Sequence, residues 1–493
     1  MTTDADLPEQ LRVRREKRER LRAAGRDPYP VSFERTATAA DLRARFADLE
    51  PGARTGEHAA VAGRVLLNRI GGKLSFATLR DGSGDIQVML AADALGADEL
   101  AAWKTDVDLG DHVGVVGEVV TTRRGELSVR ASDWTLTAKA LRPLPDKWHG
   151  LTDVETRVRQ RYVDLIVNPE ARTLVTTRSK VVTALRETMA ARGFLEVETP
   201  MLHPVHGGAT ARPFVTHHNA LDLKLYLRIA PELYLKRLIV GGVERVFEIN
   251  RNFRNEGIDT RHNPEFTMLE AYETYGDYNS MADLAQELIL AAADRAIGTR
   301  RVPAGDDGEV DLDGPWPKVP VLEAVAKAAG RAVSLDDVDG LRDSAAAAGV
   351  DVSTASSAGA IVLELYDHLV EPHTMRPTFY VDFPVDVSPL TRAHRSVPGV
   401  AERWDLVIAG REIGTAYSEL TDPVEQRRRL EAQSAAKAAG DPEAMELDED
   451  FLRALEYGMP PTGGLGLGVE RLLMVLTNST VRETILFPLV RPE

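Results

Sequence analysis

This 493-residue sequence lacks cysteine and long apolar runs. Without cysteine, disulfide bonds and thiolate metal sites are excluded, and any metal ion must be held by oxygen or histidine ligands. No stretch reaches the roughly 18 consecutive apolar residues typical of a membrane helix, and the amino-terminal segment MTTDADLPEQ lacks the apolar core of a signal peptide. We therefore expect a cytoplasmic protein that is neither inserted into a membrane nor secreted.

Positive charge is also scarce, with 60 Lys and Arg against 76 Asp and Glu, a net charge of −16. This balance argues mildly against a nucleic-acid partner. The segment Glu9–Arg26 is the exception, since it carries eight Lys and Arg against three Glu on an expected helix. Two interpretations of this helix stay open, a solvated surface helix and an arm that binds nucleic acid. The sequence contains no glycine-lysine phosphate loop, no dinucleotide fingerprint and no metal-binding histidine motif.

The length of 493 residues is too great for a single hydrophobic core, so at least two domains are expected. We divide the chain into a basic helix and linker over 1–57, a β-rich domain over 58–145 and a larger domain over 146–493. The larger domain mixes strand-like and helical segments, which predicts an α+β fold with a mainly antiparallel sheet flanked by helices. A part rich in Ala, Gly and Asp, about 302–359, is expected to be a mobile helical insertion.

The β-rich domain contains five short strand-like segments divided by glycine-rich turns, with one helix near Ala94–Trp103. This arrangement predicts a small closed barrel of the OB type, whose exposed face commonly binds oligonucleotides. Phe76, Gln87 and Glu126 lie in the strands expected to form that face. Because base recognition needs a stacking ring beside polar groups, these three residues are candidates for nucleic-acid binding.

The segment Val246–Tyr272 alternates apolar and polar residues on both sides of a turn-forming stretch. The pattern predicts two antiparallel strands joined by a polar, basic loop. The polar positions include Arg254, Glu256, His262 and Glu270. Two interpretations stay open: these residues form a solvated outer face, or they line a functional site.

A second notable segment, GGLGLGVERLLMVL, runs from glycines directly into an apolar helix. Gly464, Gly466 and Gly468 would let a flat ligand approach the backbone, and Arg471 lies in the first turns of the helix. A strand-to-helix junction of this kind is weak support for a site when taken alone.

Together, three segments match the signature motifs of class II aminoacyl-tRNA synthetases in order: Pro200 in RGFLEVETPML, the Phe-Arg-x-Glu of Phe253–Glu256, and Arg471. Six segments resemble class II lysyl-tRNA synthetase more closely: HGGATARPF, APELYLKRL, FRNEG, RHNPEFTMLEAY, EIGTAYSEL and EYGMPPTGGLGLGVER. The resemblance covers about residues 10–492. It implies an OB-fold domain that binds the anticodon, followed by a class II catalytic domain.

The resemblance implies that L-lysine and ATP form lysyl-adenylate and that lysine passes to the 3′ end of tRNA(Lys). Arg254 would clamp the lysine carboxylate and the α-phosphate, while Arg471 and His262, with Mg²⁺, would hold the β- and γ-phosphates. Phe266 would stack on adenine, and Glu256 would accept a hydrogen bond from the adenine amino group. The other ATP contacts that the resemblance implies are Asn263, Glu412 and Gly468.

Lysine carries an α-ammonium and an ε-ammonium, so its pocket needs carboxylates at two depths. By resemblance, Glu232 and Glu270, with the Gly208 carbonyl, would bind the α-amine, and Glu419 with Tyr272 would bind the ε-amine. Each glutamate alone is more often an ion-pair partner of an arginine, so the assignment depends on the joint pattern. The other residues implied for the lysine pocket are Arg254, Thr415 and Tyr417.

The resemblance also implies an Mg²⁺ site on Asp405 and Glu412, whose hard oxygen donors suit this ion. Three positions depart from the commonest family pattern, since Asp405 replaces Glu, Thr415 replaces Asn and Tyr417 replaces Phe. All three retain the needed carboxylate, hydroxyl or ring, and they resemble an actinobacterial branch of the family. Part of that branch carries a membrane domain that attaches lysine to phosphatidylglycerol, and no such domain is expected here.

Three alternatives stay open. An aspartyl- or asparaginyl-tRNA synthetase shares the layout but needs a cation at the distal end of its pocket, where Glu419 is expected. A lysine-activating paralogue that supplies another acceptor lacks the barrel. A regulatory, oligonucleotide-binding paralogue would not need Arg254, Glu256, Glu412 and Arg471.

A homodimer is expected through the helix Asn168–Arg192 and the strand ending at Pro200. In this class of enzymes the first signature motif forms the subunit interface. The helix also carries an apolar stripe that needs a cover, formed by Leu174, Val181, Val182, Leu185 and Met189.

Overall fold

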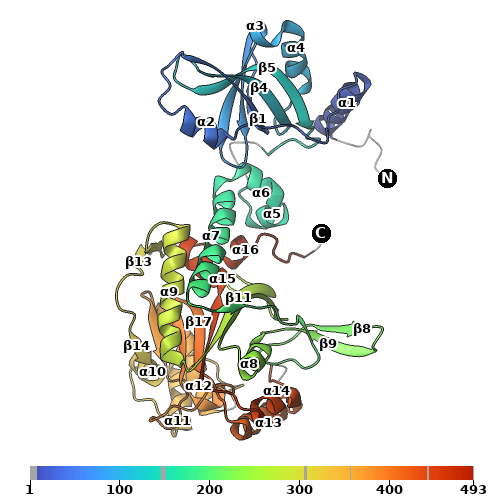
Figure 1. Cartoon of the computed structure of the whole chain (residues 1–493). Helices are drawn as coiled ribbons and strands as arrows, with labels where there is room; N and C mark the ends of the chain where they lie inside the picture. The colour runs from blue at the N-terminus through green and yellow to red at the C-terminus, as the bar shows by residue number, and fades with distance from the viewer. Residues whose placement is uncertain (1–7, 146–150, 305–307, 356, 441–442, 492–493) are drawn as a thin grey trace. The chain divides into compact units, whose positions relative to one another are not determined.

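The computed structural model describes residues 8–145, 151–304, 308–355, 357–440 and 443–491. The chain divides into two compact units, Met1–Leu151 and Thr152–Glu493, which are described separately (Figure 1). Across the described ranges, no helix has both the length and the apolar character needed to cross a membrane. The finer domain boundaries expected at 57/58 and 145/146 stay predictions.

The first unit is built on a closed barrel of five strands in the order β1-β2-β3-β5-β4. Inward-facing residues such as Val65, Val88 and Val115 are fully buried and alternate with more exposed neighbours, as a barrel strand requires. The predicted OB-type barrel is confirmed. The elements of this unit are α1 (Glu9–Ala23), α2 (Ala39–Arg45), β1 (Arg54–Arg69), β2 (Leu74–Arg80), β3 (Asp85–Ala91), α3 (Ala92–Leu95), α4 (Ala97–Asp106), β4 (His112–Thr121) and β5 (Leu127–Ala138).

The basic helix α1 packs on the barrel. Arg14 donates hydrogen bonds to the carbonyls of Leu109 and Ala140, both at 2.9 Å, and Lys17 pairs with Asp108 at 2.7 Å. Part of the positive charge of α1 is therefore neutralised within its own unit. For these two side chains the structure favours a helix docked on the protein surface over an arm that reaches for nucleic acid.

The second unit is built on an eight-stranded sheet with the order β14-β15-β16-β17-β18-β11-β10-β6. Neighbouring strands are antiparallel except for the pairs β14–β15 and β10–β6, so the predicted mainly antiparallel α+β fold is confirmed. The strands are β6 (Leu195–Glu196), β10 (Arg245–Phe253), β11 (Glu265–Thr274), β14 (Lys318–Pro320), β15 (Thr378–Val381), β16 (Arg403–Ile408), β17 (Arg411–Ser418) and β18 (Thr462–Gly468).

One face of this sheet carries the largest core, formed with α7 (Pro169–Ala191), α9 (Tyr278–Ala296) and α15 (Val469–Thr477) (Figure 1). The centre of the apolar stripe of α7 is part of this core, since Val181, Leu185 and Met189 are fully buried. These three residues do not need a second subunit as their cover, because α9 and the sheet of the same chain cover them. The expectation of an uncovered stripe is wrong for them.

The remaining elements surround this sheet. Among its described residues, the part expected to be a helical insertion, about 302–359, contains the helices α10 and α11 and the short strands β13 and β14, and β12 lies at its start; β14 joins the main sheet. A separate three-stranded sheet has the order β7-β9-β8. The further elements are α5 (Val154–Arg159), α6 (Arg161–Val167), β7 (Leu202–His203), β8 (Val215–His218), β9 (Leu223–Leu227), α8 (Glu232–Val240), β12 (Arg301–Pro303), β13 (Glu309–Asp311), α10 (Val321–Ala329), α11 (Val338–Ala348), α12 (Ala358–Leu369), α13 (Pro423–Ala438), α14 (Glu449–Glu456) and α16 (Val481–Thr484).

Candidate active site

The predicted hairpin forms, and its polar side is buried. β10 and β11 pair antiparallel, with Val246 opposite Tyr272 and Glu248 opposite Glu270. The exposed fractions of Glu248, Glu270 and Asn252 are only 4%, 4% and 0%. The interpretation of this side as a solvated outer face is therefore wrong for the strand residues, although Glu256 and His262 in the loop are exposed. Buried charges need partners or a ligand, so this face of the sheet is a candidate binding site.

The candidate residues of β11, β17 and β18 share the sheet face opposite the largest core. Both Glu270 and Thr415 pair in register with Gly466. Because side chains alternate along a strand, Leu465 and Leu467 point into the core on the other face. The residues that line the polar face are Met268, Glu270 and Tyr272 of β11, Thr415 and Tyr417 of β17, and Gly464, Gly466 and Gly468 of β18.

Gly464 allows two candidate side chains to meet. A Cβ atom at this position would collide with Glu419 Oε1 and would lie 2.7 Å from the ring of Tyr272. The space that a side chain would fill here is thus occupied by Glu419 and Tyr272. Glycine at this position is required by the close approach of these two residues, which are far apart in the sequence.

The structure brings together the three glutamates that the resemblance assigns to lysine binding. Glu232 begins α8, Glu270 lies in β11 and Glu419 directly follows β17, and all three are buried. Burial, followed by the nearby Glu232, raises the pKa of Glu270 well above its ordinary value. Burial also raises the pKa of Glu419 to about 8, against the opposing effect of Lys236. Such shifts mean that the carboxylates share one poorly hydrated space.

Gly208 lies against the same cluster. Its φ of +88° is in the left-handed region that favours glycine, and a Cβ atom added there would lie 3.1 Å from Glu232 Cβ. The backbone at Gly208 therefore passes close to the first of the three glutamates.

Lys236 is a member of this cluster that sequence analysis missed. Its Nζ lies 2.6 Å from Glu232 Oε1 and 2.5 Å from Glu419 Oε2, and the residue is fully buried. The signal was present in the segment ELYLKRLIV, where a lysine follows Glu232 by four residues on the buried side of a short apolar helix.

Arg254 stands at the end of β10, next to the glutamates. Its guanidinium carbon lies 5.1 Å from the centre of the Phe266 ring, and its Nε has no hydrogen-bond partner within the described part of the chain. Burial lowers the pKa of Arg254, and the nearby carboxylate of Glu256 opposes that effect. A cation that is poorly hydrated and incompletely bonded is suited to bind an anionic ligand.

The loop between β10 and β11 holds two further ATP candidates. His262 is exposed, and its Nδ1 lies 2.8 Å from Asp259 Oδ2. Asn263 is buried and donates a hydrogen bond to the Glu265 carbonyl at 2.6 Å. Its Oδ1 has no partner among the residues that the structure describes.

A second group of charges surrounds Glu412. Arg471, in the first turn of α15, lies 3.0 Å from Glu412 Oε2. Burial raises the pKa of Glu412, but Arg471, Arg403 and then Arg254 outweigh it, so that the pKa is lowered. Asp405 binds the Arg403 guanidinium through both oxygens, at 3.1 and 2.8 Å. Arg403 was also missed, although it lies only two residues before Asp405.

The surroundings of Asp405 and Glu412 are rich in negative charge. Burial and the nearby Glu371, Asp405 and Glu412 raise the pKa of Asp367 to about 7. This excess of carboxylates fits a divalent cation. Over the described ranges, however, no group of three or more Asp, Glu or His is arranged to hold a metal ion without other ligands. The donors therefore fit Mg²⁺ only where substrate phosphates and water complete its coordination, which is the usual way that Mg²⁺ is bound.

Two of the three nucleic-acid candidates lie on one outer face of the barrel. Phe76 on β2 is paired with Met89, and Gln87, two residues before Met89 on β3, is paired with Ser128 on β5. Gln87 Nε2 donates to the Ser128 hydroxyl at 2.8 Å. Since alternate residues share a face, Phe76 and Gln87 are presented together. The expectation that Glu126 lies in a strand is wrong, because this exposed residue precedes β5 and lies 3.4 Å from Arg43 of α2.

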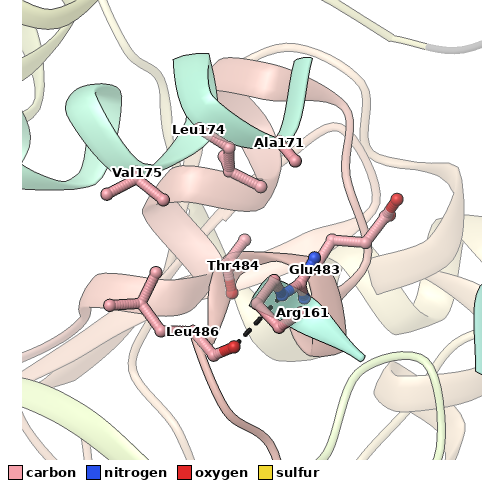
Figure 2. Close-up of a pocket in the computed structure, with 7 residues that line it drawn as sticks. All are labelled: Arg161, Ala171, Leu174, Val175, Glu483, Thr484 and Leu486. Atoms are coloured by element: carbon pink, nitrogen blue, oxygen red, sulfur yellow. Dashed lines mark hydrogen bonds between the residues drawn. The ribbon is translucent and has the colours of Figure 1, made fainter. Parts of the chain in front are cut away.

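The cavity in Figure 2 is not part of either site. It lies where α6, α7 and α16 meet, has a volume of about 10 Å³ and has room for about one water molecule. Arg161 donates a hydrogen bond to the Leu486 carbonyl there at 3.1 Å. Its lining residues are Arg161, Ala171, Leu174, Val175, Glu483, Thr484 and Leu486.

Comparison with known proteins agrees with this geometry. Residues 153–491 match the family of class II tRNA synthetases (D, K and N), and residues 59–137 match an OB-fold nucleic acid binding domain. The chain is 56% identical over 490 residues to a lysine–tRNA ligase of Mycolicibacterium gilvum and 55% identical over 490 residues to one of Kineococcus radiotolerans. In both cases the match covers 99% of this chain and 98% of the relative.

A relative of another kind is the lysylphosphatidylglycerol biosynthesis bifunctional protein LysX of Mycolicibacterium vanbaalenii. It is 56% identical over 491 residues, which are 99% of this chain but only 44% of that protein. The lysine–tRNA ligases, by contrast, match this chain over nearly their whole length. On the strength of these matches and of the family match to its second unit, the chain belongs to the class II lysyl-tRNA synthetases.

Proposed function

We propose that this enzyme activates L-lysine with ATP to form lysyl-adenylate and transfers the lysyl group to the 3′ end of tRNA(Lys). The observation that carries the proposal is the buried cluster of Glu232, Glu270 and Glu419 beside Arg254. Lysine complements it with two ammonium groups for the glutamates and one carboxylate for the arginine. An aspartate side chain would be repelled by the same glutamates. Since translation takes place there, we place the activity in the cytoplasm.

Within this pocket, Glu419 Oε1 and Tyr272 are proposed to bind the ε-ammonium. Glu419 Oε1 lies over Gly464 and has no hydrogen-bond partner among the described residues, so it is free to accept one from the substrate. The α-ammonium is assigned to Glu232, Glu270 and the Gly208 carbonyl. Thr415 and Tyr417 share the same sheet face and would complete the wall of the pocket.

In the activation step, a lysine carboxylate oxygen attacks the α-phosphorus of ATP and pyrophosphate leaves. Both reactants are anions, so the barrier falls when fixed cations stand beside them. Arg254 is proposed to hold the carboxylate and the α-phosphate, and Arg471 with His262 the outer phosphates. No protein nucleophile is required, because positioning and electrostatics supply the rate. The residues proposed to hold the adenosine part are Glu256, Asn263, Phe266 and Gly468.

Mg²⁺ is proposed to bind at Asp405 and Glu412, with ATP phosphates and water as its other ligands. The ion would screen the phosphate charges. In the chain itself, Arg403 and Arg471 orient these two carboxylates through the ion pairs described above.

The barrel is proposed to read the lysine anticodon, in a domain over 58–145 that precedes a catalytic domain over 146–493. Phe76 would stack on a base, while Gln87 and Glu126 would contact base edges. The proposal is supported by the presentation of Phe76 and Gln87 on one face of the barrel, with the exposed Glu126 directly before β5.

A homodimer through α7 and the segment from β6 to Pro200 is also proposed; the strand expected to end at Pro200 ends at Glu196 in the structure. The support comes from exposed apolar residues on both sides of Pro200, since Leu195, Met201 and Leu202 have exposed fractions of 59%, 48% and 45%. Light scattering should give about twice 54.0 kDa, and Leu195→Asp combined with Leu202→Asp should shift the mass towards the monomer. A wild-type monomer that is fully active would contradict the proposal.

ATP-pyrophosphate exchange with each of the twenty amino acids tests the proposed function most directly. Lysine should be activated at least a hundredfold more efficiently than any other. The activated lysine should then pass to a tRNA(Lys) transcript and not to a tRNA(Asp) transcript. Preferred activation of aspartate or asparagine would assign the enzyme to a related branch. Lysine activation without transfer to tRNA would indicate another acceptor, and no activation at all would indicate a regulatory paralogue.

A further inference from the structure

The lysine pocket contains a lysine of the protein itself. Lys236 enters from α8 and lies between Glu232 and Glu419, with no exposed surface. Under the proposed function, these two glutamates bind different ammonium groups of the substrate. One ammonium group of the protein therefore contacts both of the glutamates that would select the substrate by its length and charge.

We propose that Lys236 is a positioning residue for amino-acid selection, whose ammonium stays between Glu232 and Glu419 when substrate lysine is bound and holds both carboxylates at the spacing that lysine requires. This inference rests on the proposed function and deepens it. It adds to the pocket a second protein cation, beside Arg254, that does not touch the reacting atoms.

The contacts leave room for both ammonium groups at Glu419. Its Oε2 faces Lys236 at 2.5 Å. Its Oε1 lies over Gly464, beside the Tyr272 ring. Within the described part of the chain neither oxygen meets the geometry of a hydrogen bond, so the two are distinguished by the ion pair, which is made by Oε2 alone. The carboxylate thus presents one oxygen to the protein and the other to the substrate. Lys236 does not need to leave for the substrate to bind.

The charge of the pocket supports the same arrangement. Counted in their charged forms, three glutamates face two cations, Lys236 and Arg254, which leaves one formal negative charge in excess. Lysine, with two ammonium groups and one carboxylate, brings one net positive charge, and the formal charges of the loaded pocket balance. Displacing Lys236 from Glu419 would leave its ammonium buried with Glu232 alone, so the buried charges would be less well paired. A neutral loaded pocket is the stable arrangement in a poorly hydrated space.

Removing the cation should change the titration of Glu419. Among the described residues, the titratable groups that act on Glu419 are Lys236 and Glu232 on α8, and Tyr272 on β11 also interacts with it; Gly464 of β18 faces its Oε1. Of these, Lys236 is the group that lowers the pKa of Glu419. Without it the pKa rises further above about 8, so the neutral form of the carboxyl is favoured more strongly at pH 7 than in the wild type. The protonated form loses its attraction for an ammonium group, and raising the pH restores that attraction.

The first test is a crystal structure of the wild-type protein with bound L-lysine, which needs no variant. We expect Lys236 Nζ to stay within hydrogen-bond distance of both Glu232 and Glu419 while the substrate ε-ammonium contacts Glu419 Oε1. A structure in which substrate lysine displaces Lys236 from either glutamate would overturn the proposal, because Lys236 would then be a placeholder for the substrate.

The second test is Lys236→Met, which keeps the length of the side chain and removes the charge. In ATP-pyrophosphate exchange at pH 7, the KM for lysine should be at least thirtyfold higher in the variant than in wild type. At pH 9 this ratio of the two KM values should be at least fivefold smaller than at pH 7. Discrimination between lysine and norleucine, its analogue without the ε-ammonium, should fall at least tenfold at pH 7. The KM for ATP should change less than threefold.

Arg237→Met is the matched control. It removes one charge from the next position of α8, where Arg237 pairs with Asp448 at 2.7 Å and not with the pocket. Its KM for lysine should stay close to that of wild type at pH 7 and at pH 9.

The outcomes separate the two proposals. If wild type does not activate lysine, the proposed function fails. If wild type activates lysine, two results refute the positioning role alone. In the first, the KM of Lys236→Met for lysine stays within threefold of wild type; in the second, it rises by the same factor at pH 7 and pH 9. If the variant does not fold, the lysine-bound wild-type structure decides.

Discussion

Glu419→Gln is the sharpest test of the lysine pocket, because it preserves the shape of the side chain and removes its charge. Glu419 is 3% exposed, and its Oε1 is directed into the pocket beside Tyr272. The substrate ε-ammonium would enter this poorly hydrated space and find no charged partner there. Breaking a buried ion pair on one side costs about 3–5 kcal/mol.

The structure lowers the expected loss to slightly below this range. After the substitution, Lys236 still pairs with Glu232 at 2.6 Å, so the protein itself does not keep an unpaired charge. We expect a loss of about 2.7 kcal/mol, or about a hundredfold in kcat/KM for lysine. The KM for ATP should hardly change, because Arg254 and Arg471 are untouched.

The measurement is ATP-pyrophosphate exchange over a range of lysine concentrations at saturating ATP. Glu449→Gln is the control, since Glu449 forms an exposed ion pair with Arg427 on α13 and should stay within threefold of wild type. If Glu419→Gln also activates lysine within threefold of wild type, the pocket assignment is refuted and the amino-acid identity rests on the relatives alone.

Three further predictions concern other parts of the molecule. Gly464→Ala should lower kcat/KM for lysine at least tenfold with little change in the KM for ATP, because its Cβ would displace Glu419 and the Tyr272 ring; unchanged lysine kinetics would show that the two side chains can give way. Phe76→Ala should raise the KM for tRNA, since one stacked base contributes about 1–3 kcal/mol, and leave adenylate formation unchanged; equal losses in both assays would assign Phe76 a structural role. Burial lowers the pKa of His203 from 6.5 to about 4, so the unfolded state takes up the proton first and stability should fall as the pH drops from 6.5 towards 4; His203→Gln should make this fall shallower in a melting series, and an unchanged slope would contradict the reasoning.

Much of the architecture was predictable from local pattern. The five barrel strands were visible as short alternating segments between glycine-rich turns, and the β10–β11 hairpin as two alternating runs around Asn263-Pro264. Alternation and turn chemistry act between residues close in the chain, so a single sequence carries them. The boundaries of α7, expected at Asn168–Arg192 and observed at Pro169–Ala191, depend on a proline and a glycine near its ends.

The chemical character of the site was also readable, because motif residues are identified by type and order. Arg254, Glu256 and Arg471 follow from the order of the motifs alone. What pattern alone left open was whether the polar side of β10 faces water. That depends on Arg228, which pairs with Glu248 at 2.7 Å, and on α8, which packs against the hairpin.

The sequence by itself determined the fold class, the family and the set of charged residues that the site contains, since each of these is written in local periodicity or in ordered motifs. Only the tertiary structure decided how those charges are paired. It covered the stripe of α7 with α9 of the same chain, and it inserted Lys236 between Glu232 and Glu419. Electrostatic energy depends on distance and hydration, and both are set by packing between segments that the order of residues does not place side by side.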